Sequence, residues 1–394
     1  MEMESKLVAH PRQSGRVSVE NLPPSMIRKL ANPSRGLNDV IPLWFGEPDR
    51  PTPEFICEAA IDSLKAGHTF YKPNLGIEPL RVALADYTNG LYETRFGPEN
   101  IVVTNSGLVA LGLASQCVVN EGDTVVTHAP MWPNLPAIQE VLGAQVVRVP
   151  LEMRSGAWRL DLDRLFAACT PETTMMMINS PSNPTGWMLN DVEQQAILDF
   201  CRHRGLWLIA DEVYNRLVYD APRAPSFSGK INDDDKALLV NSFSKTWAMT
   251  GWRLGWLTIP KSMEKTFEML VEYNFSCVPE PTQRAGIVAA RDGEQFVSES
   301  VARYRQARDC LLEHLANFPR VTCVRPESTF YSWLSLDGMT DSYAFAEQAI
   351  HEAKVGMAPG IAFGPEGEGH LRICFAVDTD LIEQAIDRLG PMLR

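Results

Sequence analysis

The sequence predicts an α/β fold with a mostly parallel central sheet flanked by helices, followed by a smaller α+β domain. From about residue 53 to 290, short and almost continuously apolar runs alternate with helical patterns, as expected of strands buried on both faces of a parallel sheet. After residue 290 this alternation stops, and a long helical pattern precedes scattered short strands. The chain has 394 residues, 45% hydrophobic and 22% charged, which suffices for two packed domains without disulfide or metal support.

Seven apolar runs are the predicted strands of the large domain. They are Ile101–Thr104, Thr124–His128, Val146–Val149, Met175–Ile178, Leu206–Ala210, Leu238–Val240 and Leu254–Ile259. Between the fourth and the fifth, Asn190 and Glu193 form a capping-box pattern and Gly205 supplies a stop signal, which together predict a helix. Residues 1–40 are polar and rich in Pro, Asn and Ser, and we expect an arm with little regular structure there.

The C-terminal third predicts a unit in which helices and strands are mixed. Its predicted elements are a helix at 297–315, strands at 321–324 and 331–334, a helix at 342–354, a strand at 371–376 and a helix at 381–389. We therefore divide the chain into an N-terminal arm with part of the small domain (1–52), a large α/β domain (53–290) and a small α+β domain (291–394).

Composition and charge exclude several classes of protein. Lys and Arg number 36 against 49 Asp and Glu, a net charge of −13, which argues against binding to nucleic acid or an anionic membrane. The N-terminus lacks the basic and apolar regions of a secretory signal, and no apolar stretch approaches a membrane span. Eight scattered cysteines without CxxC predict free thiols in the cytoplasm. Seven histidines without HExxH predict no metal site.

The segment NSFSKTWAMTGWRLGW (241–256) places a lysine in an unusual context. A lone lysine is ordinarily a solvated surface residue. Here Lys245 is surrounded in sequence by Trp247, Trp252 and Trp256, which are costly to expose. A lysine held among them would be desolvated, which lowers its pKa and frees its amine for Schiff-base chemistry. Three nearby side chains are suited to hold a phosphate, namely Ser242, Ser244 and Arg253.

The segment LWLIADEVYNRL (206–217) places Asp211 at the end of a buried strand, where α/β sheets form their ligand sites. One interpretation is that this carboxylate caps the next helix. The other is that it faces a pyridine nitrogen, keeps that nitrogen protonated and makes the ring an electron sink. Tyr214, three residues later, is positioned to reach the same ligand.

Three further motifs are weaker signals. NSPSNPTGWML (179–189) is turn chemistry, but Asn183 would project from a strand end. Strand, Ser106-Gly107 and helix form an anion cradle, without the GxGxxG of a dinucleotide site. Arg372 lies inside an apolar strand and needs a partner, either an internal Asp or Glu or the carboxylate of a substrate.

Together these motifs resemble the class I/II aminotransferases, the pyridoxal-phosphate enzymes of fold type I in the aspartate aminotransferase superfamily. The resemblance extends from Ile41 to the C-terminus, and LWFGEPD (43–49) and PGIAFG (359–364) also match its pattern. It implies that the large domain binds pyridoxal 5′-phosphate, that Lys245 forms the Schiff base and moves the substrate proton, and that Asp211 partners the pyridinium nitrogen.

The resemblance also assigns the remaining side chains. Tyr214 and Asn183 would hydrogen-bond the 3′-oxygen of the ring, and Trp132 would stack on it. Arg372, with Gly46 and Asn183, would bind the substrate α-carboxylate. Tyr71 would reach the phosphate of a neighbouring subunit, which implies a homodimer with active sites at its interface. The phosphate would be held by Ser106, the backbone of Gly107 and Leu108, Ser242, Ser244 and Arg253.

One departure from the family pattern bears on the substrate. Dicarboxylate-specific members carry a second arginine on a partner-subunit loop downstream of the lysine, but residues 266–283 contain no basic residue. Another branch places a lysine near the phosphate helix, where this chain has Leu108. We therefore expect a neutral or aromatic amino donor rather than a dicarboxylic one.

Three functions fit these observations. The first is a ping-pong aminotransferase that acts on an amino acid and a 2-oxo acid. The second is a lyase or synthase of the same fold, such as a cysteine-type β-lyase, because the cofactor performs the carbanion chemistry and the protein selects the bond. The third is a regulatory or scaffold protein without turnover, which is disfavoured because the residues before Ile41 are too few for a DNA-binding domain with its linker.

Overall fold

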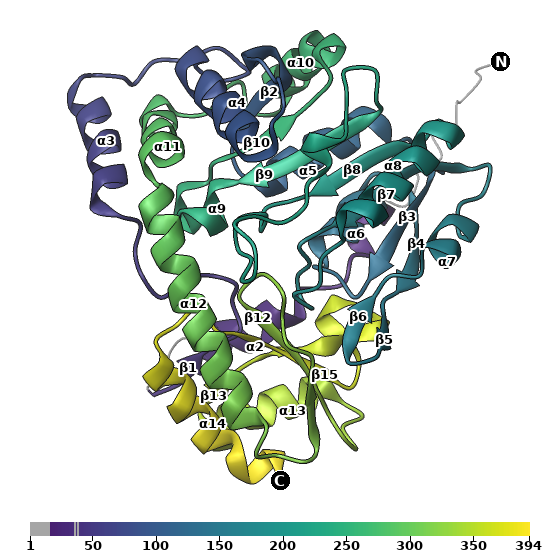
Figure 1. Cartoon of the computed structure of the whole chain (residues 1–394), viewed down its shortest axis with the longest axis vertical. Helices are drawn as coiled ribbons and strands as arrows, with labels where there is room; N and C mark the ends of the chain where they lie inside the picture. Colours follow the sequence, from purple (N-terminus) through teal and green to yellow (C-terminus); the bar gives the residue numbers. More distant parts are fainter. Residues whose placement is uncertain (1–15, 35–36, 38) are drawn as a thin grey trace, which may run out of the picture.

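All seven predicted strands join one mixed sheet in the computed structural model of the chain, which describes residues 16–34, 37 and 39–394 (Figure 1). The strand order is β2-β10-β9-β8-β7-β3-β4, and β10 runs opposite to the other six strands. The α/β class with a mostly parallel sheet is confirmed. The strands are β2 (Ile101–Thr104), β3 (Thr124–Ala129), β4 (Gln145–Pro150), β7 (Thr173–Asn179), β8 (Trp207–Asp211), β9 (Ala237–Ser242) and β10 (Gly255–Thr258).

The central strands are apolar throughout because helices cover both faces of the sheet. Along β7, Met175 and Met177 pack in one core cluster, whereas Met176 and Ile178 pack in another. All four side chains are fully buried. Successive side chains of a strand point to opposite faces, so a run such as MMMI is stable only when neither face meets water.

The helices of the large part follow the predicted alternation with strands. Asn190 Oδ1 accepts from Glu193 N at 2.9 Å, Glu193 Oε2 accepts from Asn190 N at 2.8 Å, and Gly205 ends the helix at φ +68°. Within the described ranges, no helix is long and apolar enough to cross a bilayer. The helices are α3 (Glu54–Lys65), α4 (Glu78–Tyr92), α5 (Gly107–Val118), α6 (Asn134–Val141), α7 (Leu162–Ala167), α8 (Asp191–Arg204), α9 (Phe243–Thr246), α10 (Glu264–Asn274) and α11 (Glu280–Asp292).

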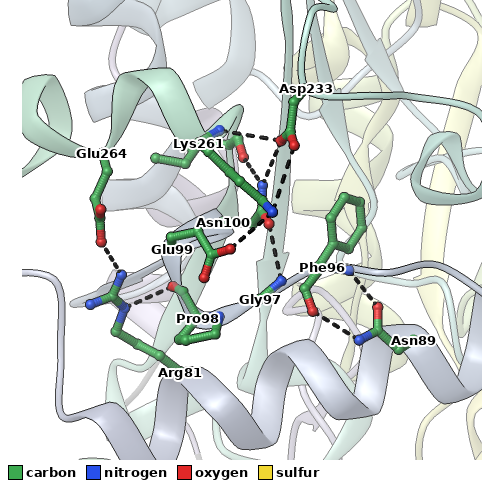
Figure 2. A network of polar contacts seen from close by, with 11 residues as sticks. Arg81, Asn89, Phe96, Gly97, Pro98, Glu99, Asn100, Asp233, Lys261 and Glu264 are labelled. Atoms are coloured by element: carbon green, nitrogen blue, oxygen red, sulfur yellow. Dashed lines mark hydrogen bonds and ion pairs between the residues drawn. The ribbon is translucent and has the colours of Figure 1, made fainter.

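A polar network fixes the start of the edge strand β2 (Figure 2). Asn100 donates to Asp233 Oδ1 at 3.0 Å and to the Ile259 carbonyl at 2.9 Å. Arg81 pairs with Glu264 at 2.6 Å and donates to the Pro98 carbonyl. The buried Asn100 thus ties β2 to the end of β10, which sets where the opposite end of β2 delivers the first turn of α5.

The smaller part is built on a four-stranded sheet of order β11-β12-β15-β14. The long helix α12 (Glu294–Leu315) runs down its side and contacts the last helix, α14 (Thr379–Leu393) (Figure 1). Its other elements are β11 (Val321–Cys323), β12 (Tyr331–Leu336), α13 (Ser342–Gln348) with a π-helical turn at Ala349–Ala353, β13 (Val355–Gly356), β14 (Ala358–Pro359) and β15 (His370–Cys374). The predicted boundary at residue 290 falls inside α11, and the domain division remains a prediction.

The N-terminal region differs from the prediction. Residues 26–34 form helix α2 (Met26–Ser34), which follows a single turn, α1 (Val17–Glu20). Ile27, Leu30 and Ala31 are buried on one face of α2, so the expectation of little regular structure was wrong there. Strand β1 (Ile41–Pro42) then pairs in parallel with β13. Residues 1–15, 35, 36 and 38 lie outside the described part.

Candidate active site

The carboxyl ends of β7, β8 and β9 converge with the first turn of α5 around one cavity of about 580 Å³. This edge is where open α/β sheets bind ligands. Segments from the small part, including residues 45–47 and β15, close it. Of the predicted residues, those that line the cavity are Gly46, Gly107, Leu108, Trp132, Asn183, Asp211, Tyr214, Ser242, Ser244, Lys245, Arg253 and Arg372.

Lys245 projects from the short helix α9 at the end of β9. Its Nζ donates to the Gly46 carbonyl at 2.5 Å. Burial lowers the pKa of Lys245 to about 8, and Arg372 acts in the same direction. The aromatic rings that face Nζ are Tyr214 and Phe330, at 5.9 and 5.8 Å from the ring centroids.

The tryptophans of this segment do not surround Lys245 as the sequence predicted. Trp247 and Trp256 pack against Phe243 in the core beneath the site rather than facing the ammonium. The predicted desolvation of Lys245 is present, but it comes from residues distant in sequence.

Asp211 ends β8 and is 4% exposed. Its Oδ1 accepts from Val213 N at 3.3 Å. Burial raises the pKa of Asp211 to about 7, although the Val213 amide and Lys245 oppose the rise. A buried carboxylate of this kind is stabilised by any cation that approaches it.

Tyr214 and Tyr331 share a hydrogen bond of 2.8 Å between their phenolic oxygens. Burial raises the pKa of both hydroxyls above the ordinary range of tyrosine. Tyr331 also fixes the backbone of Gly46, since a Cβ at this glycine would lie 1.8 Å from the Tyr331 hydroxyl oxygen. The chain can pass beside this tyrosine only because residue 46 has no side chain.

Arg372 is 3% exposed in β15 and has no acidic partner in the described residues. Its Nη1 donates to Asn183 Oδ1 at 2.8 Å, and its Nη2 donates to the Trp44 carbonyl. The guanidinium stacks on Tyr331 at 4.3 Å, while its Nε is buried without a partner. The internal ion pair that the sequence left open does not form, which leaves a carboxylate ligand as the other choice.

The predicted phosphate site is only partly assembled by side chains. Ser242 and Ser244 share a hydrogen bond of 2.9 Å, and Arg253 donates to the Thr250 carbonyl at 2.6 Å. Ser106 does not line the cavity, because its Oγ caps α5 by accepting from Val109 N at 3.2 Å. The first amides of α5 have no intrahelical acceptor, so its N-terminus presents positive potential to the cavity.

Tyr71 is not brought to this cavity within one chain. It is 90% exposed, beside Phe70 at 78%. Its role at the phosphate of another subunit stays a prediction.

Three polar residues stand out among those that the sequence missed and the fold brings to the cavity. Asn179 ends β7, and its Oδ1 accepts from the Asn183 amide at 2.9 Å. Tyr331 enters from β12, and Arg28 enters from α2. A signal existed for Asn179, which follows the MMMI run directly as Asp211 follows its strand. Tyr331 and Arg28 lie in segments whose local sequence gives no hint of the cavity.

The charges of the cavity fit pyridoxal phosphate. Lys245, Asp211, Arg253 and Arg372 form no ion pair with one another or with other side chains of the described chain. Asp211 and Arg372 are buried, Lys245 is half-buried and Arg253 is exposed at the rim, and burying a charge without a partner is costly. A ligand with an aldehyde, a pyridinium, a phosphate and an attached carboxylate would satisfy each of them.

Comparisons with known proteins agree with the geometry. The chain matches the family model "Aminotransferase class I and II" over residues 38–389. It is 35% identical over 382 residues to aromatic-amino-acid aminotransferase 2 of Thermococcus litoralis, covering 95% of this chain and 97% of that protein. It is 33% identical over 373 residues to an aspartate aminotransferase of Pyrococcus horikoshii, covering 94% of each. A single mutant of Thermus thermophilus aspartate aminotransferase superposes with a TM-score of 0.90 at 30% identity, covering 97% and 100% of the chains.

These matches extend over nearly the whole chain and confirm the resemblance inferred from its motifs. The family uses pyridoxal phosphate, so the protein is a pyridoxal-phosphate-dependent enzyme that transfers amino groups. The chain belongs to the class I and II aminotransferases.

Proposed function

We propose that the cavity transfers the amino group of a neutral or aromatic L-amino acid to a 2-oxo acid by a ping-pong mechanism. The observation that carries this proposal is the set of buried, unpaired charges around one cavity. The apolar part of the cavity wall supports the donor class, because Ile27, Phe45, Leu108, Leu111 and Trp132 line it.

Each buried charge has one proposed task. Pyridoxal phosphate, when bound, supplies an aldehyde for the substrate nitrogen and a ring that withdraws electrons from Cα. Asp211 holds the proton on the pyridine nitrogen. Arg372 orients the α-carboxylate with two donors, assisted by Asn183 through its 2.8 Å contact.

Lys245 is the proposed proton carrier. Its pKa of about 8 leaves an appreciable fraction of free amine near neutral pH, which suits a general base. With pyridoxal phosphate bound, Nζ would hold the aldehyde carbon until the amino group of the substrate displaces it. The freed amine would then take the proton from substrate Cα and deliver it to the former aldehyde carbon. Tyr214 and Asn183 donate to the ring 3′-oxygen, and Trp132 stacks on the ring.

The phosphate has proposed ligands in the first turn of α5, at Gly107 and Leu108, and in Ser242, Ser244 and Arg253. The Ser106 hydroxyl contributes indirectly, because it caps the same helix. A Cβ at Gly107 would lie 3.1 Å from Ser242 Cβ and 3.3 Å from Val213 Cγ1. A larger residue would therefore crowd the cradle.

The enzyme is proposed to act as a cytoplasmic homodimer. Its eight cysteines are free thiols, which suits a reducing compartment. Phe70, Tyr71, Met269 and Tyr273 are large hydrophobic side chains exposed at 78%, 90%, 58% and 88%. The two segments adjoin, since Asn74 donates to the Glu268 carbonyl and to Glu272 of α10. A patch of exposed hydrophobic side chains is typical of a contact with another protein, and Tyr71 would then reach the phosphate of the neighbouring active site.

The test is the absorbance spectrum of the purified holoenzyme, recorded before and after single amino acids are added without an oxo acid. Conversion of the cofactor from its aldehyde to its amine form by a neutral or aromatic amino acid supports the proposal and identifies the donor. Release of pyruvate and ammonia from a cysteine-type substrate, with no amine form of the cofactor, would instead establish the lyase reaction.

A further inference from the structure

His128 is a buried histidine that no step of the proposed reaction uses. It lies near the end of β3 and is fully buried. Burial lowers the pKa of His128 to about 4, so its ring is neutral near neutral pH. Its Nδ1 has no hydrogen-bond partner among the described residues, and a buried polar atom without a partner costs free energy. The contacts of the other ring nitrogen, Nε2, therefore decide what this histidine does.

Nε2 of His128 contacts the main chain of Asn179, the last residue of β7. It lies 3.2 Å from the Asn179 amide nitrogen and 3.1 Å from the Asn179 carbonyl oxygen. The backbone pairing of β3 with β7 ends at Thr127 and Met177, so beyond that point the imidazole replaces the main-chain bonds. In the neutral ring Nε2 accepts from the amide in one tautomer and donates to the carbonyl in the other. Each tautomer ties the end of β7 to β3.

The side chain of Asn179 connects this contact to the reacting groups. Its Oδ1 accepts from the Asn183 amide at 2.9 Å, and its Nδ2 donates to the Asp211 carbonyl at 3.3 Å. Asn183 Oδ1 in turn accepts from Arg372 at 2.8 Å. A displacement of Asn179 would therefore shift residues that are proposed to hold the cofactor ring and the substrate carboxylate.

The ring of His128 also packs on the far end of the same turn. Its centroid lies 5.2 Å from the centroid of the Trp187 ring, and the two rings meet edge to face at 67°. Trp187 is 3% exposed. Its carbonyl accepts from the Ser182 amide at 2.8 Å, which closes the turn beside Asn183. One imidazole therefore contacts the turn 179–187 on both sides of Asn183.

We propose that His128 is a positioning residue that holds the turn 179–187, and with it the Asn183 side chain, in the geometry that the reaction requires. His128 itself does not line the cavity, so it acts through Asn179 and Trp187. This inference rests on the tasks proposed above for Asn183. Loss of the Nε2 contact should weaken the hold of Asn183 on the ring oxygen and on Arg372.

Two substitutions separate the hydrogen bond from the packing. His128→Phe keeps an aromatic ring against Trp187 and removes Nε2. His128→Gln loses the ring but retains an amide long enough to reach Asn179. His128→Asn, whose shorter amide extends only as far as Nδ1, replaces the phenylalanine variant if that protein does not fold.

Thr127→Val is the matched control. Thr127 precedes His128 in β3 and is also fully buried. Its Oγ1 donates to the Met177 carbonyl at 2.7 Å, so the variant likewise removes one buried hydrogen bond between β3 and β7. Thr127 does not line the cavity and has no contact with the turn 179–187 through its side-chain hydrogen bonds.

Hydrogen exchange of the apoenzyme, followed by mass spectrometry, measures the turn without cofactor. In His128→Phe the exchange rate of residues 179–187 should rise about 10-fold relative to the strands of the sheet, because loss of one hydrogen bond eases local opening. His128→Gln should restore much of the protection. Thr127→Val should leave the ratio between turn and strands as in wild type.

The holoenzyme gives two further readouts. The visible band should change colour at a higher pH in His128→Phe, because a displaced Asn183 leaves more negative charge on the ring oxygen. The Kd of butyrate, an unreactive carboxylate, should rise about 3- to 10-fold, because Arg372 is oriented less firmly. Asn183→Ala should show both changes in full, and adding His128→Phe to it should cause no further change in either.

Wild-type values of all three readouts in His128→Phe would overturn the inference, and so would equal changes in Thr127→Val. Additive effects in the double variant would do the same, since His128 would then act independently of Asn183. Failure of the proposed function has a different signature. Asn183→Ala itself would then change neither the band nor the binding of butyrate, and the inference would fall with the task given to Asn183.

Discussion

The hydroxyl oxygens of Tyr214 and Tyr331 lie 2.8 Å apart in the wall of the cavity. Because burial keeps both phenols protonated, one must donate to the other. Tyr214 comes from the turn after β8, and Tyr331 comes from β12 of the small part. This hydrogen bond links Tyr214, which is proposed to contact the cofactor, to Tyr331, whose ring stacks on the Arg372 guanidinium.

Tyr331→Phe keeps the ring and removes this hydrogen bond. We expect kcat/KM to fall up to about 10-fold, since a net hydrogen bond contributes about 0.5–1.5 kcal/mol. A weaker Tyr214 donor leaves more negative charge on the cofactor ring oxygen, which holds the proton on Lys245 Nζ to higher pH. The visible band of the holoenzyme should therefore change colour at a higher pH than in wild type. An unchanged titration would show that Tyr331 acts only as packing.

Lys245→Ala removes the proposed proton carrier. Turnover should fall by at least about 10³-fold, within the range that positioned acid–base groups contribute. The fold should survive, because the lost amine is a desolvated group with a single hydrogen bond, to the Gly46 carbonyl. Steady-state kinetics and circular dichroism together check both statements. Appreciable transamination by a folded variant would reject the role given to Lys245.

The pH dependence of cofactor capture follows from the lowered pKa of Lys245. Only the neutral amine attacks an aldehyde, and the amine is neutral above a pKa of about 8. The rate at which the apoenzyme binds pyridoxal phosphate should therefore rise between about pH 7 and 9 and then level. Stopped-flow absorbance measures it. A rise centred near the ordinary lysine value of 10.5 would mean that the amine is not desolvated.

Asp211→Asn should stabilise the apoenzyme at high pH and weaken cofactor binding. The folded pKa of Asp211, about 7, lies above its ordinary 3.8, so the folded state binds an extra proton between these values. Stability from this group therefore falls as pH rises from about 4 to 7. The amide introduced by Asp211→Asn does not titrate, so the variant does not lose this stability. The difference in free energy of unfolding between the variant and wild type should therefore grow by about 1–3 kcal/mol from pH 5 to pH 8. Urea unfolding of both apoproteins at each pH decides it.

Subunit mixing tests whether Tyr71 acts across an interface. Lys245→Ala and Tyr71→Ala are each expected to be impaired as homodimers. A mixed dimer would contain one site with Lys245 from one chain and Tyr71 from the other, so activity should return on mixing. Lys245→Ala mixed with Asp211→Asn is the control, because those residues belong to the same chain's site and no intact site forms. Absence of recovery in a verified mixed dimer would place Tyr71 outside the site.

The strands and the central motif residues were predictable because their signals are local. A strand buried on both faces carries its own apolar run; Asp211 directly follows such a run, and Lys245 comes five residues after another. Helix α2 has a helical pattern in its own sequence, but neighbouring turn residues argue against a helix. Ile27, Leu30 and Ala31 have helical spacing, but Asn32-Pro33-Ser34 is turn chemistry that argues against a helix there.

Tyr331 and Arg28 could not be assigned from local pattern. Tyr331 meets Tyr214 across 117 positions of sequence, and its own segment TFYSWL is typical of any buried strand. Arg28 is one charge on an exposed helix face. Tertiary structure alone brings each residue to the cavity, and it places the Phe45 ring beside Arg28.

The pairing of the early segment 41–43 with the last part of the chain has a consequence for biosynthesis. The Ile41 amide donates to the Lys354 carbonyl, the Leu43 amide donates to the Gly356 carbonyl, and Cys374 donates back to Leu43. The seven-stranded sheet, by contrast, is complete once residue 258 has been made. A nascent chain can therefore assemble its large sheet before residues 354–374 have been made. Until then, the segment that carries the Trp44 and Gly46 carbonyls, which bind Arg372 and Lys245, has no strand to pair with. Catalytic competence is thus withheld until the whole polypeptide has emerged.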